Sequence, residues 1–97
     1  MSLVAPSFHP DAVSAELMHQ EDGWFLWFVL GQARVFDFIM KESVREDIGD
    51  RAVKNERSVI RYLESRLKSA GYEGVTRRPN VMGRVDTVAV WDFAASS

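Results

Sequence analysis

The first 40 residues follow a pattern of apolar and polar positions that predicts three β-strands. Residues 13–18 alternate strictly between apolar and polar or exposed types, as in a strand with one face in water. The sequence QEDG at 20–23 places an Asp-Gly pair where a tight hairpin turn is expected. Residues 24–30 form the next apolar run, and Gly31-Gln32 separates it from a third run at 34–40. We therefore expect an antiparallel meander with residues 24–30 in its central strand.

The central run, WFLWFVL, is apolar at every position, so both of its faces need cover. Burial of one large apolar side chain is worth about 1.5 to 3 kcal/mol, and an exposed patch of this size is uncommon on a monomer. One face can pack on the domain's own helices. The other is covered either by residues 3–8 or by a second copy of the chain, and we favour the second copy. The expected interface residues are Trp24, Phe25, Trp27 and Val29.

The second half of the chain predicts two helices and a closing strand. Residues 41–49 fit one or two helical turns that end at Gly49, after which Asp50 can cap the next helix. From Arg51 to Ala70 the apolar residues form one stripe along a helix of about 20 residues. A loop with room for a short strand near Val75 leads to an alternating strand at 85–93. The order β-β-β-α-α-β predicts an α+β fold, an antiparallel sheet packed against two helices.

Length and composition limit the number of domains, the partners and the location that we expect. A chain of 97 residues, 46% of them hydrophobic, has room for one domain, which we place at 11–97 after an irregular N-terminal arm at 1–10. The net charge of −2 gives no general attraction to nucleic acid or to an anionic membrane. The chain has no cysteine, lacks a basic, apolar leader, and has no apolar run near the roughly 20 residues that cross a bilayer. We expect a cytoplasmic protein without membrane association.

Candidate catalytic and metal-binding residues are weak in this sequence. His9 and His19 each have acids nearby, but neither spacing puts two ligands on one face of a helix, so no metal and no cofactor are predicted. No serine has the glycine-flanked context of a nucleophile, and the neighbouring acids Glu46 and Asp47 fit a solvated helix surface. We therefore assign no catalytic residue, and an enzyme is not favoured.

Three arginines form the best candidate ligand site. Arg77, Arg78 and Arg84 surround a Pro-Asn turn, and their guanidinium groups can hold a phosphate or carboxylate through forked hydrogen bonds. The competing interpretation is that they are solvated side chains around a loop. Arg57 and Arg61 share one side of the long helix, but acids are interspersed there, so no uniform basic stripe is expected.

Three stretches carry a resemblance to a known family. They are IMKESVREDIGD, KNERSVIRYLESRL and the closing VWDF. Together they resemble a small bacterial family of uncharacterised proteins, the DUF1488-like proteins, in which a short sheet leads into such a helix and the chain ends in a strand with Asp-Phe. The resemblance covers about the last two thirds of the chain. It implies the layout of the fold and transfers no catalytic residue, and the basic loop at 77–84 departs from it.

These observations predict a small interaction or regulatory module that forms a homodimer through an aromatic sheet surface. A different protein is an alternative partner for this surface. The alternative function is binding of nucleic acid, which is less favoured, or of a phosphate ligand through the loop at 77–84. A small enzyme of unknown class is the third hypothesis.

Overall fold

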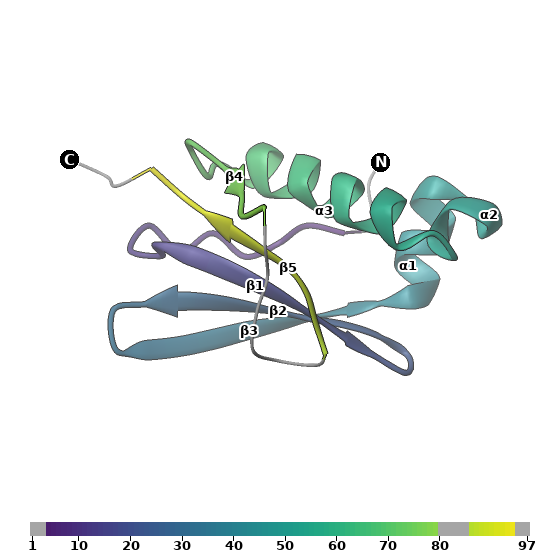
Figure 1. Cartoon of the computed structure of the whole chain (residues 1–97), viewed down its shortest axis with the longest axis horizontal. Coiled ribbons are helices and arrows are strands. Elements are labelled where there is room, and N and C mark those ends of the chain that lie inside the picture. Colours follow the sequence, from purple (N-terminus) through teal and green to yellow (C-terminus); the bar gives the residue numbers. More distant parts are fainter. Residues whose placement is uncertain (1–3, 80–85, 95–97) are drawn as a thin grey trace.

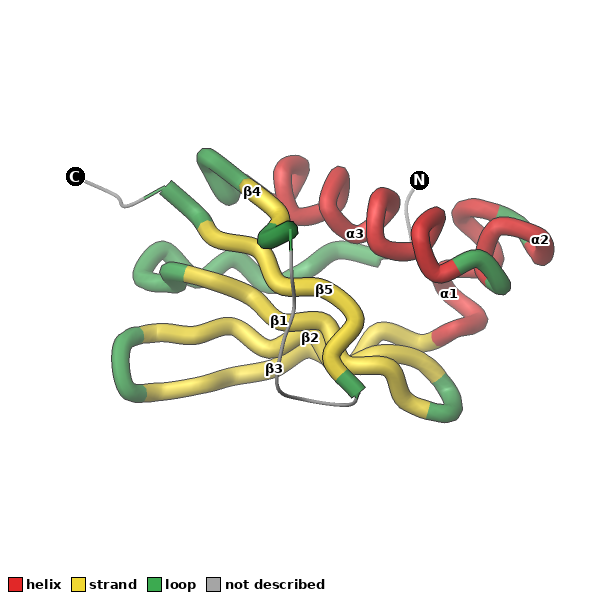
Figure 2. The backbone as a smooth tube through the Cα atoms, in the orientation of Figure 1, coloured by secondary structure: helices red, strands yellow, loops and turns green. Residues whose placement is uncertain are grey.

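The computed structural model describes residues 4–79 and 86–94, and it confirms the predicted α+β class. Five antiparallel strands form one sheet in the order β3-β2-β1-β5-β4. Three helices lie between β3 and β4 in the chain and gather on one side of the sheet (Figures 1 and 2). The strands are β1 (Ser14–Gln20), β2 (Gly23–Leu30), β3 (Ala33–Met40), β4 (Thr76–Arg77) and β5 (Thr87–Asp92), and the helices are α1 (Lys41–Ile48), α2 (Asp50–Val53) and α3 (Glu56–Ala70).

The meander of β1, β2 and β3 follows the predicted pattern. Trp27 in β2 lies opposite Glu16 in β1 and Phe36 in β3, so these three residues share one face of the sheet. The strands are joined by tight turns at 21–22 and 31–32. Directly after the first turn, a Cβ on Gly23 would lie 2.1 Å from the carbonyl oxygen of Ile39. The close approach of β2 and β3 at this point therefore requires glycine.

The predicted continuous helix from Arg51 to Ala70 is wrong, because the chain leaves the helical conformation at Asn55. Asn55 is extended, with φ −102° and ψ 111°, and its side chain accepts a hydrogen bond from the backbone N–H of Ser58 at 3.4 Å. It is therefore the N-cap of α3. Asp50, which we expected as a cap, is the first residue of α2. None of the helices in the described residues is long and apolar enough to cross a membrane.

The closing strand contains an irregularity that its alternating sequence does not predict. Leu17 lies opposite Ala89, whereas the next residue, Met18, lies opposite Thr87, so Val88 is an extra residue in β5. The bulge places Thr87 on the face opposite to Ala89, and strict alternation is wrong at this position. The predicted short strand near Val75 appears as β4, which pairs with the end of β5. Residue 85 lies outside the described residues.

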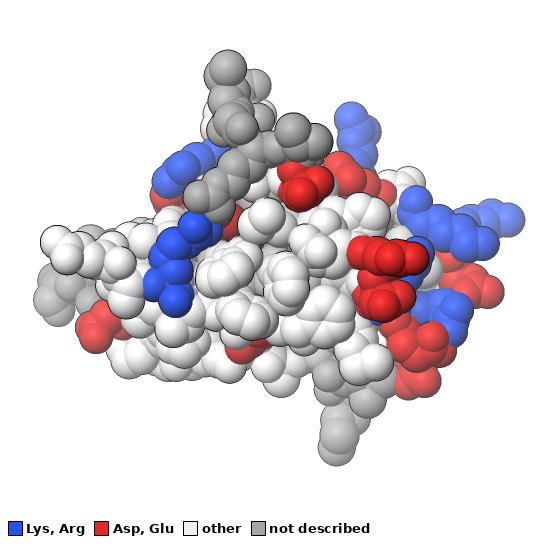
Figure 3. Space-filling view, turned by 90° about the horizontal axis from the view of Figure 1, so that it is seen from below, with Lys and Arg blue, Asp and Glu red and all other residues white. Residues whose placement is uncertain are grey.

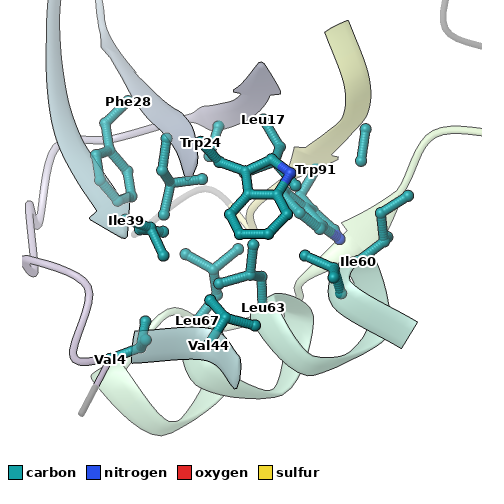
Figure 4. Close-up of a cluster of buried hydrophobic side chains, with 14 of the residues drawn as sticks. Val4, Leu17, Trp24, Phe28, Ile39, Val44, Ile60, Leu63, Leu67 and Trp91 are labelled. Atoms are coloured by element: carbon teal, nitrogen blue, oxygen red, sulfur yellow. The ribbon is translucent and has the colours of Figure 1, made fainter. Parts of the chain in front are cut away.

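The core lies between the sheet and the helices. Leu17, Leu26 and Trp91 from the sheet and Leu63 and Leu67 from α3 are fully buried there. Figure 4 shows these layers meeting, with Val4 of the N-terminal arm beside them. This core cluster lies on one face of the sheet, and the side chains that alternate with it point to the other side, where Val90 of β5 is also buried.

The described part of the N-terminal arm, residues 4–10, packs on the helix side of the sheet. The carbonyl oxygen of Val4 accepts a hydrogen bond from Arg66 Nε in α3 at 2.9 Å. Ser7 donates through its backbone N–H and its hydroxyl to the carboxylate of Asp37 in β3, at 2.7 and 2.9 Å. The arm is thus fixed at both α3 and β3.

Candidate functional site

The side of the sheet away from the helices carries a group of large apolar side chains. We call it the open face. No described helix lies over it, and Phe36, Phe38 and Met40 of β3 are 50, 45 and 55% exposed. Seen from below the sheet, uncharged surface fills the middle of the molecule and charged side chains gather at the margins (Figure 3). The apolar residues of the open face on β1, β2 and β3 are Met18, Phe25, Trp27, Val29, Phe36, Phe38 and Met40.

The aromatic rings of the open face pack against one another across β2 and β3. The ring of Phe25 meets Phe36 at 5.0 Å and Phe38 at 5.4 Å between centroids, both edge to face. Trp27 lies 4.8 Å from Phe36. Such cross-strand pairs stabilise a sheet and restrict the rotamers of both partners. The open face is therefore a pre-ordered aromatic surface.

One charged pair borders this surface at Trp27. The guanidinium of Arg34 lies 5.0 Å from the centre of the Trp27 ring and forms an ion pair with Glu16 at 2.5 Å. Trp27 Nε1 is buried and has no hydrogen-bond acceptor among the described atoms. The exposed part of the Trp27 indole is therefore apolar, because its one polar atom is shielded from solvent.

The apolar surface continues around the outer edge of β3. A groove of about 420 Å³ lies between this strand and residues 4–7 of the arm, and Phe36, Phe38 and Met40 line it. The carboxylate of Asp37 occupies the same edge and is held by Ser7. A charged side chain on an edge strand disfavours pairing with a further strand. The geometry therefore favours contact through the face rather than through the edge.

The structure separates the predicted interface residues into two groups. Phe25, Trp27 and Val29 lie on the open face and are half-buried. Trp24 lies on the opposite face, 4% exposed in the core, so it is not available to a partner. The described residues of the arm do not cover the open face, because they bind α3 and the helix side of β3. Phe36, Phe38 and Met40 were not among the predicted interface residues, although their alternation in β3 places them together.

The predicted arginine site is also divided. Arg78 makes a forked ion pair with Asp92, with N–O distances of 2.8 and 2.7 Å, and this hydrogen-bonded pair lowers the pKa of the Asp92 carboxyl. Arg77 and Arg78 both line a groove with Arg57 and Arg61 of α3, two residues that sequence reasoning left out of the site, but Arg77 has no ion pair with a described acid. The sequence did contain a signal for Arg57 and Arg61, because arginines four residues apart lie on the same side of a helix. Arg84 lies outside the described residues.

The two histidines lie apart from both candidate surfaces. The ring of His9 packs 5.0 Å from Phe28, and the ring of His19 lies 5.9 Å from Trp24. Within residues 4–79 and 86–94, no three histidine or acidic side chains come together in a way that could hold a metal ion. The open face and the arginine groove are therefore the two candidate sites among the described residues.

Comparison of the chain with protein-family models, with curated proteins and with solved structures found no match. The resemblance to the DUF1488-like proteins therefore stays a prediction. The function proposed below rests on the geometry and chemistry of this chain.

Proposed function

We propose that this protein is an interaction module that forms a homodimer by packing the open faces of two copies together. The observation that carries the proposal is the exposure of Phe36, Phe38 and Met40 on a pre-ordered aromatic surface that no described helix covers. A two-fold axis brings the same patch of each copy together, so one apolar surface serves both sides. The lack of cysteine fits a reducing cytoplasm as the place where the dimer acts.

The size of the open face indicates how tight this dimer is. Strands of seven or eight residues rise ~3.3 Å per residue and lie ~4.8 Å apart, so β1, β2 and β3 project onto roughly 26 by 14 Å, or about 370 Å². A standard interface buries about 800 Å² of accessible surface per partner. Side-chain relief and the groove along β3 add to the projected area, which places this interface at the lower end of the range. We therefore expect a dimer that dissociates on dilution.

The charges at the margin favour a second copy over a strongly charged partner. Arg34 is already paired with Glu16, so the border of the open face near Trp27 has no excess charge of either sign. The middle of the face is uncharged in Figure 3, and Phe25, Trp27 and Phe36 lie there. A partner that matches it is therefore another apolar, nearly neutral surface, and the same face on a second copy meets this requirement.

The test is the solution mass measured by light scattering over a dilution series, for the parent chain and for Phe36→Asp. We expect the parent to approach twice the monomer mass at high concentration and Phe36→Asp to stay monomeric, because the dimer would bury the new carboxylate without a partner. Val35→Asp is the matched control. Val35 is the neighbouring residue on the same strand, 37% exposed, and it points to the other face.

A second variant, Met40→Asp, tests the same surface in case Phe36→Asp does not fold. Met40→Asp changes the most exposed apolar residue of the open face, at the end of β3, where Met40 is the N-cap residue of α1 and an aspartate can cap that helix. Far-UV circular dichroism verifies that each variant is folded. A parent chain that is monomeric at every concentration would contradict the proposal, as would folded Phe36→Asp and Met40→Asp variants that dimerise like the parent.

A further inference from the structure

A second surface feature lies on the helix side of the sheet, where four arginines line a groove with an apolar floor, and one of them, Arg78, is paired with Asp92. The groove between the first half of α3 and the β4–β5 edge has a volume of about 480 Å³. Arg57 and Arg61 are one helical turn apart and line the same side of it. Arg77 comes from β4, opposite Trp91, so the strand directs it toward the helix side. Residues from two elements, 16 or more positions apart in sequence, thus face one opening.

The positive charge of this groove is not neutralised within the described chain. Arg57, Arg61 and Arg77 form no ion pair with any described acid. The nearby acids are engaged elsewhere, since Asp92 holds Arg78 and Glu64 accepts a hydrogen bond from Trp91 Nε1 at 3.0 Å. Three like charges around one opening repel one another, and an anion bound among them removes that repulsion. The groove is therefore electrostatically suited to a multiply charged anion.

The floor of the groove has a different character from its rim. It is formed by Ile60 of α3 and by Val88 and Ala89 of β5, of which Ile60 and Ala89 are 7 and 1% exposed. The bulge in β5 directs Val88 to the helix side beside Ala89. A surface that combines a few charged groups with apolar lining, in a volume between about 300 and 1,000 Å³, is typical of a small-molecule site.

We propose that this groove binds a small phosphorylated ligand, with its phosphoryl groups among Arg57, Arg61 and Arg77 and its apolar part on Ile60, Val88 and Ala89. Three guanidinium groups match a di- or triphosphate better than a single carboxylate, because each guanidinium offers a fork of donors to phosphate oxygens. A nucleoside triphosphate represents this class, since it joins a polyphosphate to a flat, largely apolar base.

The experiment is isothermal titration calorimetry of the full chain at low salt with three probes. The probes are ATP, inorganic tripolyphosphate and adenosine. We expect ATP to bind more tightly than tripolyphosphate, because only ATP also uses the floor, and adenosine to bind too weakly to measure. We expect Arg57→Gln, Arg61→Gln and Arg77→Gln each to weaken ATP binding about tenfold or more, as loss of one charged hydrogen-bond partner does.

Arg51→Gln is the matched control, because Arg51 is an exposed arginine of α2 with no ion pair among the described residues and lies outside the groove. It removes the same charge and should leave ATP affinity nearly unchanged. All four arginines are exposed, so thermal melts should show folded variants. The proposal is overturned if ATP binds no more tightly than about 1 mM, or if Arg51→Gln weakens binding as much as the groove variants.

A single-stranded oligonucleotide separates this proposal from nucleic-acid binding. If the oligonucleotide binds through Arg57, Arg61 and Arg77 while ATP and tripolyphosphate do not, the small-ligand proposal is wrong. If ATP binds with the expected pattern, the groove is a small-ligand site whatever the oligomeric state of the protein. Neither result depends on the dimer that we propose for the open face.

Discussion

The hydroxyl of Tyr72 is a third polar anchor of the N-terminal arm, beside Asp37 and Arg66, and Tyr72→Phe isolates its contribution. The hydroxyl accepts a hydrogen bond from the backbone N–H of His9 at 2.9 Å and donates one to the carbonyl oxygen of Ser7 at 2.8 Å. The ring is buried and stacks on Phe28 and Phe93, with centroid distances of 5.5 and 4.4 Å. Phenylalanine keeps this stacking and removes both hydrogen bonds.

The expected loss in the free energy of unfolding follows from those two hydrogen bonds. Each hydrogen bond contributes about 0.5 to 1.5 kcal/mol net, so Tyr72→Phe should lower the free energy of unfolding by about 1 to 3 kcal/mol. For a domain of this size, a loss of about 2 kcal/mol lowers Tm by roughly 8 to 16 °C. Urea denaturation should show a lower midpoint with an unchanged slope. Hydrogen exchange should show faster exchange of the His9 amide, which has lost its acceptor.

The pH dependence of stability gives a second, independent readout. Burial raises the pKa of Tyr72 above its usual value of 10.0. The unfolded chain therefore releases this proton at lower pH than the folded chain, and the corresponding stability is lost as the pH rises above 10 through the folded pKa. Tyr72→Phe has no proton to release at this position. The stability difference between parent and variant should therefore narrow above pH 10.

Tyr62→Phe is the control for a lost tyrosine hydroxyl elsewhere in the fold. Tyr62 in α3 donates a hydrogen bond to Asp47 in α1, remote from the arm. We expect this variant to lose stability without faster exchange at His9. If Tyr72→Phe matched the parent in both its urea midpoint and the exchange of His9, the Tyr72 hydroxyl would not anchor the arm and the reasoning would be refuted.

Two further substitutions test the helix packing. Asn55→Ala removes the cap of α3 and should cost about 0.5 to 2 kcal/mol in thermal denaturation followed by circular dichroism; an unchanged Tm would mean that the long Asn55–Ser58 hydrogen bond contributes nothing. Leu63→Ala opens a cavity at a fully buried position and should cost about 2 to 5 kcal/mol in urea denaturation, while Leu30→Ala at a half-buried position should cost clearly less; equal losses would contradict the position of Leu63 in the core.

The sheet was the part of the fold most open to prediction, because local sequence encodes it. Alternation in residues 13–18 and 34–40 identifies the strands, and the turn sequences between them fix antiparallel neighbours. The apolar stripe of α3 likewise follows from helical spacing. The break before α3 did not, because Val53 and Ile60 on either side of it are seven residues apart and keep the helical spacing of the stripe. The extended backbone of Asn55 and its side-chain bond to Ser58 show that a helix begins there.

The candidate sites were less predictable, since they depend on contacts between distant elements. The partners of Arg77 are Arg57 and Arg61, which come together with it only when β4 joins the edge of β5 beside α3. The ion pair of Arg78 with Asp92 depends on the same strand pairing. No periodicity within either segment carries this information.

The pairing of β4 with β5 explains why the neighbouring residues Arg77 and Arg78 have different partners, although both line the groove. Arg77 lies opposite the core residue Trp91 and faces the helix side. Asp92 lies opposite Ser14, on the open face, and it forms the forked ion pair with Arg78. The charge of Arg78 is therefore neutralised by Asp92, whereas Arg77 enters the proposed ligand groove without an ion pair to a described acid. The sheet lies between the open face and the ligand groove. Phe36→Asp should therefore abolish the dimer without changing ATP affinity, and Arg77→Gln should weaken ATP binding without changing the dimer.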